Sequence, residues 1–169
     1  MVEPLWLSAA RKEIGVKEVA GPGDNPVIAE YWREAGVADV AMGQDEVPWC
    51  AAFVGAMLVR GHSVGSGAAN ARSYEKWGRG LVSPCLGAVV VISRPPVSWQ
   101  GHVAFYLGTD RAARRVCVLG GNQGDKVSIA EFSLDRVVAY RWPPGSVIQP
   151  EWIGPIAVST TNDAEPSAA

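Results

Sequence analysis

Three polar residues from separate parts of the chain could act together on a carbonyl group: Cys50, His102 and Asn122. Cys50 opens the apolar run CAAFVGAMLVR, which is long enough to form a buried helix. The first turn of a helix presents unpaired backbone N–H groups and the positive end of the helix dipole, which favour a thiolate and can hold an oxyanion. The alternative is that Cys50 is a small apolar residue of the core, as most free cysteines are.

A cysteine nucleophile needs a base, and the sequence contains two histidines. His62 follows Gly61 just beyond the expected helix end, which predicts a surface position. His102 begins the alternating segment GHVAFY, which is typical of a strand and would hold an imidazole rigidly. Asn122 lies in LGGNQGD after the next expected strand, so an antiparallel pair would bring it to the same end of the sheet as His102. There it could orient the imidazole, although such a segment is also an ordinary loop.

The elements that must position these residues divide the chain into a helical half and a β half. Helices are predicted at residues 5–14, 27–35, 49–60 and 71–77, with proline, asparagine or glycine at their ends. Apolar and alternating segments predict five strands, at residues 87–92, 102–107, 115–119, 126–132 and 137–142. Helices followed by an antiparallel sheet indicate an α+β domain over residues 1–145. Residues 146–169 are predicted to form a partly disordered extension.

Composition and charge exclude several classes of protein. The 169 residues, 48% of them hydrophobic, suffice for one domain with its own core. The net charge of −2 argues against a general nucleic-acid binder, and no apolar run reaches the roughly 18 residues of a membrane span. The two histidines and three cysteines lack the spacing of a zinc site and allow one disulfide at most. We expect a monomer without metal, cofactor, nucleic-acid partner or membrane insertion.

Taken in order, three blocks of the sequence resemble the NlpC/P60 and CHAP cysteine peptidase superfamily: Trp-Cys-Ala-x-Phe-Val, Gly-His-Val-x-Phe-Tyr and Gly-Gly-Asn-Gln. The resemblance covers roughly residues 5–142 and is closest to the CHAP-like domains of phage endolysins. It implies a papain-like α+β fold that cuts peptidoglycan without a cofactor. It also implies Cys50 as nucleophile, His102 as general base and acid, and Asn122 as orienting residue. Many CHAP domains have a glutamate two residues before that asparagine, where this chain has Gly120.

Other side chains are candidates for substrate contacts. Asp24 and Tyr31 resemble residues that flank the cleft of such domains, although helix capping explains Asp24 equally well. Trp49 and Trp99 could line a groove for a sugar or a peptide, with core packing favoured for Trp49. Gln123 could donate a hydrogen bond to the oxyanion.

The resemblance predicts a peptidoglycan hydrolase that cuts an amide bond, as an endopeptidase or an N-acetylmuramoyl-L-alanine amidase of a phage or bacterial lytic system. Asp45 and Glu46 lie just before the nucleophile, but adjacent carboxylates do not favour a muramidase, which needs two of them across an anomeric carbon. Two other classes stay open: an inactive cell-wall binding module, and an acyltransferase or deamidase with the same Cys-His dyad. The N-terminal residues lack a secretory pattern, so we expect synthesis in the cytoplasm and release by a holin or export by a dedicated system.

Overall fold

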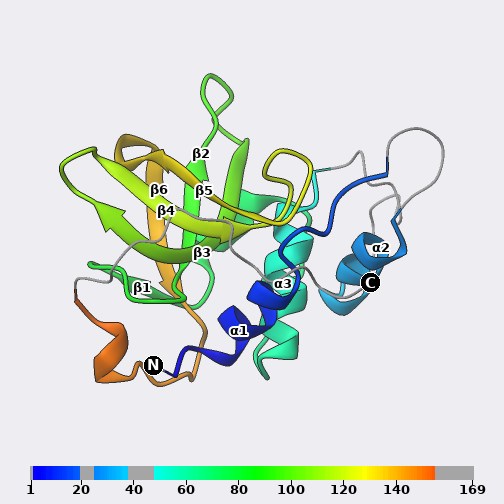
Figure 1. The fold of residues 1–169 in the computed structure, drawn as a ribbon, viewed down its shortest axis with the longest axis horizontal. Coiled ribbons are helices and arrows are strands. Elements are labelled where there is room, and N and C mark those ends of the chain that lie inside the picture. The colour runs from blue at the N-terminus through cyan, green and yellow to red at the C-terminus, as the bar shows by residue number, and fades with distance from the viewer. Residues whose placement is uncertain (1, 20–24, 38–47, 155–169) are drawn as a thin grey trace.

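The structure is a computed structural model that describes residues 2–19, 25–37 and 48–154 (Figure 1). Its α-helices gather on one side of a β-sheet, so the α+β class predicted from the sequence is confirmed (Figure 1). The helical elements are α1 (Leu5–Lys12), α2 (Pro26–Glu34), α3 (Cys50–Arg60) and the 3-10 helices η1 (Ala71–Lys76), η2 (Leu134–Arg136) and η3 (Pro150–Trp152).

The sheet is open and antiparallel, with its strands in the order β1-β6-β2-β3-β4-β5. Its strands are β1 (Arg79–Leu81), β2 (Val89–Ser93), β3 (Gly101–Asp110), β4 (Arg115–Gly120), β5 (Ser128–Ser133) and β6 (Val137–Trp142). The five predicted strands are confirmed, whereas β1 was not predicted. Strand β1 has only three residues, and buried and exposed side chains do not alternate along it. It forms because Gly80 pairs with Arg141 of β6.

Local sequence explains where the shorter helices begin. The Asn25 side chain accepts a hydrogen bond from the Val27 N–H at 2.9 Å, and Pro26 occupies the first helical position of α2. Asn70 caps η1 in the same way, accepting from the Arg72 N–H at 2.8 Å. The fourth predicted helix is therefore present at the expected place, but as a 3-10 helix.

Helix α3 forms the centre of the core, and its residues from Cys50 to Leu58 are all buried. Phe53 lies in its second turn and connects three elements by aromatic contacts. Its ring centroid is 5.4 Å from that of Tyr31 in α2 and 6.4 Å from that of Phe105 in β3. Since these rings are all fully buried, the contacts hold the N-terminal half of α3 against the middle of the sheet.

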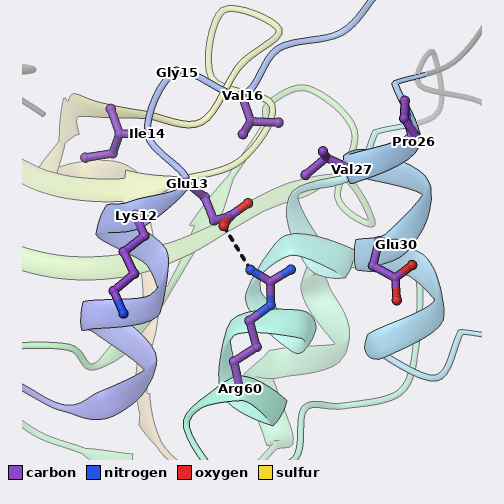
Figure 2. A pocket seen from close by; sticks show the side chains of 9 residues that line it. All are labelled: Lys12, Glu13, Ile14, Gly15, Val16, Pro26, Val27, Glu30 and Arg60. Atoms are coloured by element: carbon purple, nitrogen blue, oxygen red, sulfur yellow. Dashed lines mark hydrogen bonds and ion pairs between the residues drawn. The ribbon is translucent and has the colours of Figure 1, made fainter. Parts of the chain in front are cut away.

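A network of charged side chains joins the C-terminal half of α3 to the other two helices. Arg60 of α3 pairs with Glu13, just after α1, at 2.9 Å and with Glu34 of α2 at 2.6 Å. Figure 2 shows the first of these ion pairs from the pocket that it borders. The Tyr31 hydroxyl donates to the second Glu13 oxygen at 2.6 Å, and burial together with this carboxylate raises the pKa of Tyr31. The network fixes the position of α3, and with it the position of Cys50.

The start of the predicted C-terminal extension packs onto the domain. Trp152 is buried, its ring centroid lies 5.9 Å from that of Trp142, and its indole N–H donates to the Val2 carbonyl at 2.6 Å. Ile153, by contrast, is 64% exposed. The rest of that extension, residues 155–169, lies outside the described residues.

Candidate active site

Cys50 is the first residue of α3 and lines a pocket, although only 4% of its surface is exposed. The backbone of Val103 in β3, together with that of Ala51 and of Cys50 itself, acts to lower the pKa of the thiol. The sulfur therefore lies between the N-terminus of α3 and the strand that carries His102, next to the backbone of the residue that follows this histidine.

The protonation state of Cys50 differs from the one expected at a helix N-terminus. Burial raises the pKa of the thiol, and the hydrogen bond from Val103 and the charge of Arg94 only partly oppose this effect. The helix dipole favours the thiolate, but the cost of removing a thiolate from water is larger at this buried position. The resting form in this structure is the neutral thiol.

Two features of the sheet allow α3 to approach β3. Strand β4 pairs with β3 only from Phe105 onward, so residues 101–104 of β3 have no β4 partner along that edge. The loop after β4 also passes close to α3 at Gly121, where a Cβ atom would lie 2.6 Å from the Trp49 ring and 2.7 Å from Phe53 Cβ. Only glycine permits this contact, so Gly121 brings the loop against the first turns of α3.

His102 is fully buried near the start of β3 and is held by a polar loop. Its Nε2 lies 2.8 Å from Oε1 of Gln123, and its ring lies 5.3 Å from the Phe132 ring of β5. The other ring nitrogen, Nδ1, is buried and has no hydrogen-bond partner among the residues that the structure describes. A buried, unpaired imidazole nitrogen is costly, which makes this atom a candidate for a functional role.

The contacts of Gln123 determine the tautomer of His102. Its amide Nε2 donates to the Ser128 carbonyl at 2.6 Å, so its Oε1 must face the imidazole. Because an amide oxygen only accepts, the imidazole Nε2 must carry the proton. Nδ1 is then the basic nitrogen, with a free electron pair. Gln123 thus leaves His102 ready to accept a proton at Nδ1.

Burial also fixes the charge of this histidine. It lowers the pKa of His102 to about 4, although the hydrogen bond to Gln123 acts in the opposite direction. The imidazole is therefore neutral at pH 7. Both Cys50 and His102 are therefore in their neutral forms at rest in this structure.

The orienting contact predicted for Asn122 is made by Gln123 instead. Asn122 adopts a left-handed conformation with φ of +56°, which asparagine tolerates better than most residues. Its role in this structure is to turn the backbone so that the next side chain reaches His102. The spacing of the loop predicted its position correctly, but spacing alone could not decide which of two adjacent amides faces the ring.

Gly120 explains how the Gln123 side chain reaches the imidazole. A Cβ atom at this position would lie 2.7 Å from Gln123 Oε1 and 2.8 Å from Ala104 Cβ. The space that a side chain at residue 120 would fill is thus taken by the amide of Gln123.

Gln123, predicted as an oxyanion donor, instead donates its amide N–H to the Ser128 carbonyl and places its oxygen at His102. The other predicted substrate contacts divide into three groups. Tyr31 and Trp49 are fully buried and stack on each other with ring centroids 6.1 Å apart. The Trp49 indole also donates to Glu18 at 2.7 Å, so packing, and not substrate binding, accounts for both rings. Asp24 lies outside the described residues, as do Asp45 and Glu46. Trp99 is 65% exposed and remains a candidate.

The pocket beside Cys50 has a volume of about 350 Å³. Its wall comes from the segment before η1 and from the connection between β2 and β3, which contribute Asn70, Arg94 and Trp99. The Asn70 amide donates to the Trp99 carbonyl at 3.5 Å and links these two segments. Sequence reasoning did not identify Arg94, although its position directly after β2 places it at the same end of the sheet as His102.

No group of three His, Cys, Asp or Glu side chains in the described ranges is arranged to hold a metal ion. None of the helices in the described part of the chain is long and apolar enough to cross a membrane.

A comparison with models of known protein families finds no match, and a comparison with curated proteins finds no significant relative.

Proposed function

We propose that this protein is a papain-like cysteine hydrolase of the NlpC/P60 and CHAP type that cuts an amide bond of peptidoglycan. One observation carries the proposal: the fully buried His102 is held by Gln123 in the tautomer whose unpaired Nδ1 is basic, beside the helix that begins with Cys50. A base fixed next to a nucleophile by a third group is the arrangement that thiol hydrolases need.

The proposed reaction starts from the neutral thiol and the neutral imidazole. As the Cys50 sulfur attacks the carbonyl carbon, the thiol proton moves to His102 Nδ1, and backbone N–H groups at the start of α3 stabilise the oxyanion. Collapse of this intermediate breaks the C–N bond, while His102 returns the proton to the leaving amine. A water molecule then attacks the thioester with His102 as base, which releases the acid and restores the thiol.

The pocket beside Cys50 supports a polymeric peptide or glycopeptide substrate. Trp99 lines it, and the exposed ring of this residue offers a flat apolar surface for a sugar or a peptide segment. A thiolate forms thioesters from amides, whereas glycosidic bonds are normally cut by two carboxylates. The chemistry of the site therefore favours the amide bonds of the cell wall over its glycosidic bonds.

Digestion of purified peptidoglycan tests this function. We expect new amino groups without new reducing ends, loss of turnover in Cys50→Ala, and normal turnover in the control Cys117→Ala, which alters another buried thiol. Mass spectrometry of the fragments then identifies the amide that is cut. Reducing ends that persist in Cys50→Ala would refute the proposal. Binding without cleavage would indicate a cell-wall binding module, and a Cys50 acyl-enzyme that transfers its acyl group without lysis would indicate an acyltransferase.

A further inference from the structure

Arg94 stands directly after β2, at the start of the connection to β3, and lines the pocket that contains Cys50. Its backbone N–H donates to the Gln100 carbonyl at 3.4 Å, which closes this connection next to the pocket. Trp99 lines the same pocket from the other part of the connection. The pocket therefore presents a cation and an exposed aromatic ring beside the candidate nucleophile.

The charge of Arg94 is not used within the described protein. No carboxylate in residues 2–19, 25–37 or 48–154 forms an ion pair with it. Arg60 provides the contrast, because Glu13 and Glu34 neutralise it and it borders a pocket that holds its own counter-charge (Figure 2). A guanidinium that lines a pocket without such a partner is free to bind an anion from solution.

The same charge also acts on the candidate catalytic pair. Burial is the main influence on both groups, raising the pKa of Cys50 and lowering that of His102, and the positive charge of Arg94 lowers both values. The guanidinium and Cys50 line the same pocket, so an anion bound to Arg94 would lie in the pocket that holds the candidate nucleophile.

We propose that Arg94 binds a carboxylate of the substrate next to the scissile amide and so selects acidic peptides. The carboxylate is the matching partner because a guanidinium forms two parallel hydrogen bonds with its oxygens. Trp99 would cover the apolar part of the same residue. The choice of an acidic peptide as substrate rests on the proposed function, whereas binding of a carboxylate next to the thiol does not.

Alkylation of Cys50 by two reagents of different charge tests the site without any assumption about the reaction. Iodoacetate carries a carboxylate, whereas iodoacetamide carries a neutral amide in its place. The ratio of the two rates refers to one and the same thiolate, so a change in the pKa of Cys50 cancels. We expect Arg94→Gln to lower the ratio of iodoacetate to iodoacetamide rates by about tenfold, the effect of one charge-assisted hydrogen bond.

The control is Arg111→Gln, which removes an exposed arginine from the turn after the opposite end of β3. Ten residues of strand separate the two ends by roughly 30 Å, so this variant tests the effect of net charge alone. We expect its ratio to equal that of the unaltered protein. An unchanged ratio in Arg94→Gln, or an equal fall in both variants, would overturn the proposal.

Cleavage assays then separate this proposal from the proposed function. On a peptide cut by the protein, we expect amidation of the neighbouring carboxylate to lower kcat/KM about tenfold, and Arg94→Gln to abolish the difference. Cleavage with no preference for the free carboxylate would refute the role of Arg94 and leave the hydrolase intact. A lowered alkylation ratio in a protein that cuts no peptidoglycan would confirm the carboxylate site and refute the substrate.

Discussion

Replacement of Gln123 by methionine tests the assignment of the orienting residue. Methionine has a similar length but offers no amide oxygen, so the His102 Nε2–H would lose its acceptor at 2.8 Å in a fully buried site. The other tautomer would leave Nδ1–H equally unpaired, so the variant loses its preference for the basic Nδ1. It also loses a hydrogen bond that becomes charge-assisted when His102 takes the thiol proton, and such a bond contributes about 1.5–3 kcal/mol. Since 1.4 kcal/mol corresponds to a factor of ten, we expect activity to fall about 10- to 100-fold.

The matched control for this variant is Asn122→Gly. Glycine accepts the φ of +56° at this position, so the loop keeps its course while the Asn122 side chain is removed. We expect nearly normal activity, whereas alanine would add backbone strain and confuse the comparison. The ring nitrogens of His102 can be followed by ¹⁵N NMR, which should show the Nε2–H tautomer in the control and a mixture or the other tautomer in Gln123→Met.

A second variant, Gln123→Glu, separates orientation from mere packing. A carboxylate next to the imidazole would favour its charged form, so the pKa of His102 should rise from about 4 and the acid limb of the pH–rate profile should move upward. Thermal unfolding of each variant reports the lost contact with Ser128. A normal tautomer and rate in Gln123→Met, or an equal loss in Asn122→Gly, would refute the reasoning.

Three further predictions concern the thiols, the histidine and metals. Iodoacetamide should modify Cys50 before Cys85 and Cys117, because of these three thiols only Cys50 lines the pocket beside α3. The alkylation rate should rise toward alkaline pH, because burial raises the pKa of all three thiols. Peptide mapping that finds Cys50 the slowest to react would contradict this prediction. The pKa of His102 is about 4 in the folded chain and 6.5 in the unfolded chain, so on acidification the unfolded state takes up the proton first. The free energy of unfolding should therefore decrease by about 3 kcal/mol as the pH falls from 6.5 to 4. Urea titrations should show that His102→Gln lacks this part of the pH dependence, and an identical dependence would contradict the assignment. Activity on peptidoglycan should survive EDTA and disappear on alkylation, and the reverse result would indicate a metal enzyme.

The sequence by itself predicts the order of the elements apart from β1, and it identifies the two residues at the centre of the candidate site. The apolar run after Cys50 and the alternation after His102 are local patterns, and each predicts its element from neighbouring residues alone. Strand β1 was missed for the same reason, since its three residues become a strand only by pairing with β6, about sixty positions further along the chain.

Tertiary structure decides which amide meets the imidazole and which protons the site holds at rest. Gln123 reaches His102 because Asn122 turns the backbone and Gly120 leaves room beside β3, and these conditions exist only once β4 and β3 are paired. The neutral states of Cys50 and His102 likewise arise from burial, which is a property of the assembled core and not of any segment. Desolvation and side-chain reach depend on what surrounds a residue in space, whereas periodicity and spacing depend only on its neighbours in the chain.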